Sequence, residues 1–559
     1  MHWTGEARWV LLIAALVVVL SCLPYAYAYL ITPPNLRFTG LLFNPQDGNS
    51  YYAKMLQGAR GEWLFHLPFT SEPHQGAFIF TYYLALGHLA RLTGLPIPLI
   101  YHLARAVNGF LLLLTVYGFG TLVTARVAER RLIFLVVATS SGLGWLVGLL
   151  GYLTVDLWVP EAVTFYSILA NPHFPLAMAL MLVIFGLSAG GWGQERFPVW
   201  ARATLAGGAA LLLAVVQPFC LVTVYAVLGA NLTLLAVRYG FARRLHASPN
   251  VPGLAAQARR RRWPWAEIGG AVAVIAASGP FLLYDAWVSV ANPALRAWSA
   301  QNLTPSPPPW DYALGYGIVF LLALPGAVWA LRRGRDVHLL LVVWVVVNLI
   351  LLYLPIPLQR RLVLGLHLPL AMLAGLGLAR GVLPRLRAGR RAVMAGILAF
   401  SALTNVFLLF GAFLAATQHD ARLYLSAGEK RALDWMRDHV PPDAVVLAAP
   451  QSGLFIPAWA GQRVVYGHEF ETIDAEEKKA RVEAFFRGTD EAVLRDYGVN
   501  YVFVGPRERA LGNGAPPDDW RVAFTSDGVI VYRSPLAQQT MRGTSLTGYQ
   551  GRVRQEVFP

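Results

Sequence analysis

Charged residues are scarce in this chain. Only 14% of its 559 residues are Asp, Glu, Lys or Arg, whereas 56% are hydrophobic. Soluble domains carry about 25% charged residues. The apolar residues gather in long runs between short polar loops. This distribution excludes an ordinary soluble globular protein and predicts a polytopic α-helical membrane protein.

Cysteine is almost absent. Cys22 and Cys220 both lie inside apolar runs, so the sequence holds neither a disulfide framework nor a cysteine-rich metal site. The chain also lacks a Walker A motif, a G-x-S-x-G nucleophile elbow and a dinucleotide-binding fingerprint. These absences argue against an ATP-driven pump and against a serine hydrolase.

Lysine is rare as well. Of the 46 basic residues only four are lysine, which leaves 42 arginines, a bias typical of a GC-rich bacterial genome. The net charge is +15, but the basic residues cluster between apolar runs and form no stripe with aromatic residues. This pattern indicates membrane topology and contact with membrane lipids, and it argues against nucleic-acid binding.

Hydropathy predicts eleven membrane spans. The first is long for a signal peptide, so we expect it to be retained. The predicted spans are residues 8–31, 97–125, 131–151, 172–190, 202–217, 219–237, 266–289, 312–331, 337–354, 362–380 and 392–416.

Arginine-rich loops set the expected orientation. Five of them, at 125–131, 194–202, 238–262, 332–335 and 380–391, alternate with loops poorer in arginine. With eleven spans and a cytoplasmic N-terminus, all five fall on the cytoplasmic side, as the positive-inside rule requires. We therefore expect a multi-pass protein of the plasma (inner) membrane whose C-terminal part is extracytoplasmic.

The domain organisation follows from this topology. Residues 1–416 are predicted to form the transmembrane domain, with a first external loop at 32–96 that includes an interfacial helix at 76–93. Residues 417–535 are predicted to form an extracytoplasmic α/β domain, followed by a polar tail at 536–559. A capping box opens a helix at 426–439, and short strands are expected at 444–449, 463–467, 500–505 and 529–534.

Two acidic residues stand out in the first external loop. Asp47 precedes a short predicted helix that Asn49 or Ser50 would cap, and Glu72 precedes the interfacial helix. The simpler interpretation is that both carboxylates cap helices. A charge at the membrane edge is costly unless it is solvated or used, which favours a functional role for this pair. The same loop contains two basic residues. Lys54 is a candidate for binding phosphate, and His74 is a candidate for binding substrate or a metal.

A second pair of acids, Asp156 and Glu161, lies in the next external loop. Solvated loop acids and a role in substrate or metal binding are equally consistent with the sequence. Carboxylates from two loops can bind a divalent cation such as Mg²⁺ or Mn²⁺, although nothing in the spacing requires one. His173, between two prolines, is expected to face the same outer cavity or to pack in a turn.

The basic counterpart of these acids is "PLQRR" at 357–361. It places Gln359, Arg360 and Arg361 on the side where the positive-inside rule disfavours them. The guanidinium fork suits phosphate, so the motif predicts a phosphate site. Snorkelling to lipid headgroups is the alternative. His102 and Arg105 lie on one face of the second span and are candidates for the same site.

The stretches "NPQDGNSYYAKMLQG" and "SEPHQGAFIFTYYLALGHLARLTGLPIPLIYHLARAVNG" resemble the GT-C glycosyltransferases. The second stretch is similar to a segment of the lipid A aminoarabinose transferases and protein O-mannosyltransferases. The motifs cover residues 8–125. By this resemblance Asp47 is the catalytic acid of the first external loop, Glu72 the second acid and Arg105 the arginine of span two. The sequence departs from the family in two ways. It lacks Pro-Pro-Leu after the acid, and it lacks the Trp-Trp-Asp signature of oligosaccharyltransferases. The second absence argues against transfer to Asn.

The resemblance implies transfer of a pentose or hexose from a polyprenyl-phosphate sugar to a glycan, lipid or protein acceptor of the cell envelope. Asp47 is then the general base, and the arginines hold the leaving phosphate. Two rival hypotheses remain. One is a transporter or flippase of a lipid-linked or anionic substrate. Such a protein needs ionisable residues within its spans, and few are present here. The other is a non-catalytic envelope protein.

Overall fold

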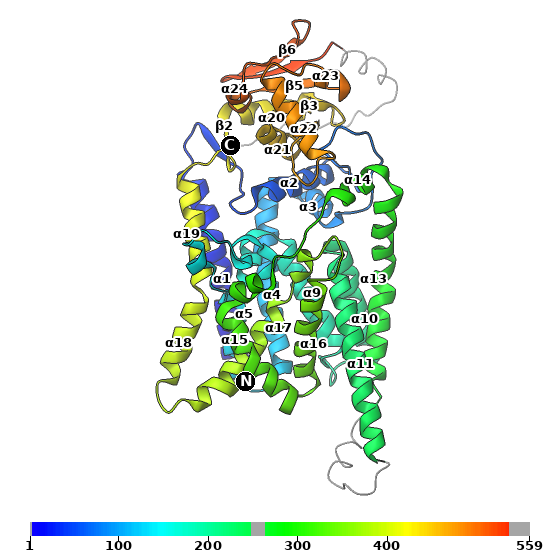
Figure 1. Cartoon of the computed structure of the whole chain (residues 1–559), viewed down its shortest axis with the longest axis vertical. Coiled ribbons are helices and arrows are strands. Elements are labelled where there is room, and N and C mark those ends of the chain that lie inside the picture. The colour runs from blue at the N-terminus through cyan, green and yellow to red at the C-terminus, as the bar shows by residue number, and fades with distance from the viewer. Residues whose placement is uncertain (1–2, 247–262, 536–559) are drawn as a thin grey trace. The chain divides into compact units, whose positions relative to one another are not determined.

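The computed structural model describes residues 3–246 and 263–535. The chain forms two compact units (Figure 1). The first, here the helical unit, consists of Met1–Pro33, Phe38–Phe65 and Gln75–Tyr424. The second, here the sheet unit, consists of Pro34–Arg37, His66–His74 and Leu425–Pro559. Strands β1 (Leu36–Phe38) and β2 (Tyr424–Ser426) form a two-stranded sheet.

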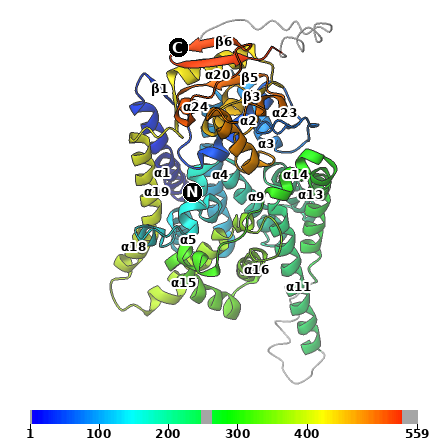
Figure 2. The same ribbon diagram turned by 45° about the horizontal axis from the view of Figure 1, so that its top comes forward.

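The helical unit is built from apolar helices joined by short loops. The α-helices are α1 (Trp3–Ile31), α2 (Pro45–Ala59), α3 (Thr81–Thr93), α4 (Ile97–Val123), α5 (Val127–Thr139), α6 (Gly144–Gly148), α7 (Val155–Trp158), α8 (Thr164–Ala170), α9 (His173–Ser188), α10 (Val199–Val216), α11 (Cys220–His246), α13 (Trp265–Ala291), α14 (Pro293–Gln301), α15 (Pro309–Arg333), α16 (Asp336–Leu351), α17 (His367–Leu376), α18 (Arg390–Ser401) and α19 (Leu403–Thr417). Shorter turns include η2 (Arg360–Val363). Helices α10, α11 and α13 lie side by side in both views (Figures 1 and 2).

Eight of the helices within the described ranges are long and apolar enough to cross a membrane, or nine if the bent pair α18 and α19 is one span. Helices α9 and α16 are also apolar but shorter. Each predicted span falls on apolar helical segments, and the spans 131–151 and 392–416 each fall on two consecutive helices. The protein is a multi-pass membrane protein, while the count of eleven spans stays a prediction.

Two glycines bring α2 and α3 into backbone contact. A Cβ added at Gly58 would lie 2.1 Å from the Leu84 carbonyl oxygen, and one at Gly87 would lie 1.9 Å from that of Met55. Any larger residue would force the helices apart. Because α2 carries Asp47, this crossing sets the position of the candidate base.

The start of α2 differs from the sequence-based expectation. We expected Asn49 or Ser50 to cap the helix, but α2 begins at Pro45, so Asp47 lies inside its first turn. Proline is favoured at this first position because its missing N–H has no partner there anyway. Asn44 precedes it in the left-handed region, at φ 45°.

Helix α15 is interrupted by a glycine. Gly317 has φ 45° and ψ −122°, which breaks the helical path. A Cβ at Gly142 would lie 2.2 Å from the Gly315 carbonyl oxygen, so the loop after α5 packs directly on the α15 backbone. The break and this glycine contact help to position the segment between α5 and α7, which includes α6.

The sheet unit has a mixed five-stranded sheet with the strand order β4-β3-β5-β7-β6. Strand β3 pairs in parallel with β4 and with β5. Strand β7 pairs antiparallel with β5 and with β6. Its elements are α20 (Ala427–His439), β3 (Val445–Leu447), α21 (Pro450–Trp459), β4 (Arg463–Val464), α22 (Ala475–Phe486), α23 (Val493–Asp496), β5 (Tyr501–Val504), α24 (Pro506–Leu511), β6 (Arg521–Ser526) and β7 (Val529–Arg533).

The capping box predicted at 426–429 is present. The Ser426 hydroxyl accepts a hydrogen bond from the Glu429 backbone N–H at 3.2 Å, and the Glu429 carboxylate accepts one from the Ser426 N–H at 2.7 Å. The four expected strands correspond to β3, β4, β5 and β7. Strand β6 was missed because it is an edge strand with an exposed, weakly alternating sequence.

Candidate functional site

Asp47 lies in the first turn of α2, where its carboxylate is half-buried. The Asn44 side-chain amide donates a hydrogen bond to Asp47 Oδ2. The N-terminal end of a helix carries partial positive charge and stabilises an anion. The Asn44 amide and the N-terminal end of α2 therefore both stabilise negative charge on the Asp47 side chain.

The structure brings Asp47, Glu161, Arg360 and Arg361 into one electrostatic group. The pKa of Glu161 lies above its usual value, mainly because the carboxyl group is buried. The charges of Arg360 and Arg361 oppose this rise, and the charge of Asp47 adds to it. All three charges therefore lie close enough to act on the Glu161 carboxyl group. These four residues come from α2, the short turn η1 (Pro160–Ala162) and η2, all within the helical unit.

Each arginine of the group is held by a specific contact. The Arg360 guanidinium lies over the Trp158 ring, 4.7 Å from its centre. Arg361 Nη2 donates to Asn302 Oδ1 at 3.2 Å. Gln359 orients the turn that carries both, since its Nε2 donates to the Leu354 carbonyl at 2.6 Å and its Oε1 accepts from the Ser306 N–H at 3.2 Å.

Aromatic residues form one wall of the group. Tyr51 and Tyr83 are stacked with ring centres 4.4 Å apart, and the His173 ring meets both edge-on. The Tyr83 hydroxyl is 2.5 Å from His173 Nδ1. The charges of Asp47, Arg361 and Lys54 reach His173. His173 thus lies at the border of the charged group.

Lys54 is buried close to the Tyr51 ring. Its side chain is 1% exposed, donates to Ser50 Oγ, and places its ammonium 4.5 Å from the centre of the Phe80 ring and 5.2 Å from that of Phe65. Its charge contributes to the electrostatics of the site. Direct contact of Lys54 with a phosphate stays a prediction.

Asp156 is fully buried and accepts several hydrogen bonds. Its Oδ2 accepts from the backbone N–H groups of Gly142 at 3.0 Å and Gly144 at 3.1 Å, and its Oδ1 accepts from Thr154 Oγ1 at 2.5 Å. These bonds fix the loop between α5 and α7. Asp156 therefore has a structural role, because its hydrogen bonds fix the segment between α5 and α7. Glu161 instead belongs to the charged group with Asp47 and the two arginines.

We expect Asp156→Asn to destabilise the helical unit by about 1–3 kcal/mol, because an amide nitrogen would face buried N–H donors. Thermal unfolding of the purified full chain in detergent measures this loss. Glu195→Gln, at an exposed acid, is the control and should leave the unfolding temperature unchanged. A variant as stable as the wild type would contradict the structural role.

Arg105 and His102 bind protein groups in the helical unit. Arg105 is 1% exposed, and its Nη1 donates to the carbonyl oxygens of Ser21 and Ile168 at 3.3 and 3.0 Å. His102 Nε2 is 2.8 Å from the Gly40 carbonyl oxygen. Arg105 therefore fastens α1 and the end of α8 to α4. Phosphate binding by Arg105 stays a prediction.

Glu72 and His74 belong to the sheet unit. The Lys478 ammonium, 1% exposed, donates to both Glu72 and Thr70 Oγ1. His74 Nε2 accepts from the Leu67 N–H at 2.8 Å, and its Nδ1 lies 2.8 Å from the Glu72 carbonyl oxygen. These contacts tie residues 66–74 to the sheet unit. Catalysis by Glu72 and substrate binding by His74 stay predictions.

The Glu72–Lys478 pair predicts an acid-sensitive stability. Partial burial raises the pKa of Glu72, but hydrogen bonds from Lys478 and Thr70 outweigh it, so the pKa lies below its usual 4.5. A lowered carboxylate pKa stabilises the fold above pH 4.5, and the contribution disappears as the pH falls through the folded-state pKa. Thermal unfolding of the wild type and Glu72→Gln from pH 7 to 3 should show a difference that vanishes at the acid end. A difference independent of pH would contradict this assignment.

The site residues do not supply a metal-binding set. Within residues 3–246 and 263–535, no group of three or more His, Cys, Asp and Glu side chains is arranged to hold a metal ion. Asp47 and Glu161 share the site with two arginines, whose positive charges oppose a cation. Dependence on Mg²⁺ or Mn²⁺ stays a prediction.

Several residues of the site were missed by the sequence analysis. Asn44, Tyr51, Tyr83, Trp158 and Asn302 surround the predicted charges. Tyr51 lies four residues after Asp47 on α2, so helical spacing indicated that neighbour. The others come from distant segments, and only the fold brings them to the site.

Several solved structures are similar to this chain. The ArnT protein of Cupriavidus metallidurans in its apo state matches with a TM-score of 0.51 at 14% identity, over 95% of this chain and 98% of that one. ArnT bound to undecaprenyl phosphate matches with a TM-score of 0.50 at 13% identity, over 97% and 99%. The oligosaccharyltransferase of Archaeoglobus fulgidus with a tethered acceptor peptide reaches 0.49 at 17% identity, over 96% and 75%.

The two ArnT structures show that the chain has the fold of the GT-C glycosyltransferases, as its sequence motifs predicted. At the level of sequence, no family model and no curated protein matches it.

Proposed function

We propose that this protein is a glycosyltransferase that moves a sugar from a polyprenyl-phosphate donor to an acceptor hydroxyl. One observation carries the proposal: a half-buried carboxylate, Asp47, shares an electrostatic group with the arginine pair Arg360 and Arg361. The GT-C fold supports it, and so does the undecaprenyl phosphate bound to ArnT, a protein of the same fold.

The chemistry needs a base and a phosphate site on opposite sides of one carbon atom. Asp47 accepts the proton of the acceptor hydroxyl, whose oxygen attacks the anomeric carbon. The bond from that carbon to the phosphate oxygen breaks, and the electron pair stays on the phosphate. Arg360 and Arg361 stabilise this charge, and displacement inverts the anomeric centre. Glu161 balances the arginines before the phosphate enters.

The remaining assignments belong to the same proposal. The protein crosses the plasma membrane eleven times with a cytoplasmic N-terminus, and the reaction takes place on the extracytoplasmic face, where the α/β sheet unit also lies. Lys54 and Arg105 assist binding of the lipid phosphate in this proposal. The acceptor is a glycan, lipid or protein of the cell envelope.

Transfer of label tests the proposal. The purified full chain is incubated with undecaprenyl phosphate carrying a radiolabelled pentose or hexose and with an extract of envelope acceptors. We expect label to leave the lipid and undecaprenyl phosphate to accumulate, with an acceptor present. Release of neither label nor undecaprenyl phosphate across the donor series would overturn the proposal.

The rival transporter hypothesis has less support. A transporter needs binding groups near the middle of the membrane between two repeats, whereas the charged group here comes from α2 and loops. Movement of an intact donor across vesicles without bond cleavage would favour the transporter.

A further inference from the structure

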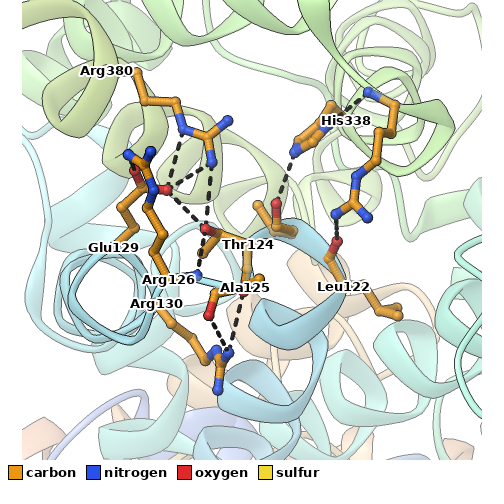
Figure 3. Close-up of polar contacts among 10 residues, drawn as sticks. Leu122, Thr124, Ala125, Arg126, Glu129, Arg130, His338 and Arg380 are labelled. Carbon is orange, nitrogen blue, oxygen red and sulfur yellow. Dashed lines mark hydrogen bonds and ion pairs between the residues drawn. The ribbon is translucent and has the colours of Figure 1, made fainter.

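A second polar site lies far from the Asp47 group, at the opposite end of α4. The C-terminal carbonyl groups of α4 and the residues after it are bound by side chains of other helices (Figure 3). His338 Nε2 donates to the Val123 carbonyl at 2.8 Å, and Arg335 Nη2 donates to the Leu122 carbonyl at 2.6 Å. His102, beside the Asp47 end, and Leu122 are twenty residues apart on α4, which is roughly 30 Å along a helix.

A cavity of about 320 Å³ opens beside this cluster. Its polar lining comes from four separate segments of the helical unit. The lining includes Leu122, Gly190, Gln194, Glu267, Arg335 and Asp336.

Two opposite charges in the lining are available to a ligand. Asp336 is already paired with Arg238 at 2.8 Å. Glu267, in the first turn of α13, has no hydrogen-bond or ion-pair partner within residues 3–246 and 263–535. Arg335 gives one side-chain hydrogen bond to Leu122, which leaves further N–H donors of its guanidinium for an anion. The cavity therefore offers a site for an anion and a site for a cation.

The flanking aromatic residues indicate where this cavity lies. Trp200 and Trp265 are each 72% exposed and stand at the start of α10 and α13. Tryptophan is enriched at the boundary between membrane and water. Glu267 follows Trp265 by two residues, so the cavity lies at the depth of lipid headgroups.

We propose that this cavity binds the headgroup of a phospholipid that carries a primary ammonium beside its phosphate. Arg335 binds the phosphate, and Glu267 and Gln194 accept hydrogen bonds from the ammonium. A quaternary ammonium cannot donate such bonds and prefers an aromatic cage, but no aromatic residue lines the described cavity. A headgroup without an amine would leave Glu267 opposite a phosphate.

Native mass spectrometry tests this binding. The full chain is equilibrated with equimolar phosphatidylethanolamine, phosphatidylcholine and phosphatidylglycerol, and the retained lipids are counted. We expect phosphatidylethanolamine to be retained about fivefold over phosphatidylcholine, as one partly exposed ion pair allows. Glu267→Gln should abolish this preference, Arg335→Gln should reduce retention of all three lipids, and the control Glu195→Gln should match the wild type.

A charge reversal guards against loss of folding. Glu267→Lys should shift the preference to the anionic phosphatidylglycerol, a gain that an unfolded variant cannot show. Equal lipid retention in the wild type, Glu267→Gln and Glu267→Lys would overturn the proposal. The retained lipids would then be bound without selection for their headgroup. Sugar transfer is not the readout, so the result is independent of the proposed function.

Discussion

Asp47→Asn should lower sugar transfer by about 10²–10⁴-fold, the contribution typical of a positioned general base. The amide keeps the size of the side chain and a hydrogen-bond partner for Asn44, but it cannot take the proton of the acceptor. The measurement is the initial rate of label transfer from the lipid donor. Binding of undecaprenyl phosphate should persist, because the arginines are intact.

Two controls define this result. Glu195→Gln removes an exposed acid outside the site and should transfer at the wild-type rate. Asp156→Asn removes a buried acid with a structural role, so it should lower the yield of folded protein more than the rate per folded molecule. An Asp47→Asn enzyme with full activity would contradict the assignment of Asp47 as base.

The double substitution of Arg360 and Arg361 by Gln should weaken undecaprenyl phosphate binding by at least about 10–100-fold. Hydrogen bonds to charged groups contribute about 1.5–3 kcal/mol each, and a tenfold change corresponds to about 1.4 kcal/mol. Binding of the lipid phosphate to the full chain is measured directly, without a sugar or an acceptor.

Arg296→Gln is the matched control, because Arg296 is an exposed arginine of the same unit outside the charged group. It should bind undecaprenyl phosphate like the wild type. Arg360→Lys should restore only part of the affinity, since a lysine keeps the charge but loses the guanidinium plane that lies over Trp158. Equal affinity of the double variant and the wild type would contradict a phosphate site here.

The apolar segments, the capped helix of the sheet unit and the main strands followed from the sequence, because hydrophobic periodicity and capping act locally. The link between Asp47 and the "PLQRR" segment was inferred from charge alone. An arginine pair on the side of the membrane that disfavours positive charge indicates that an anion binds there. The structure now brings these residues into one electrostatic group.

Other features depended on tertiary contacts that no local pattern contains. Asp156 and Glu161 look alike in the sequence, yet one accepts backbone N–H groups in the protein interior and the other faces the arginines. Glu72 pairs with Lys478, more than four hundred residues away in the chain. Side-chain type predicts that a carboxylate needs partners, but only the fold determines which ones.

The crossing at Gly58 and Gly87 has a consequence for how this protein can vary. Where side chains separate two helices, substitutions can be compensated by a neighbour that changes size. Here the two backbones touch, so no side chain is available to absorb a change. The location of the Asp47 carboxylate is therefore set by the path of the main chain at this crossing.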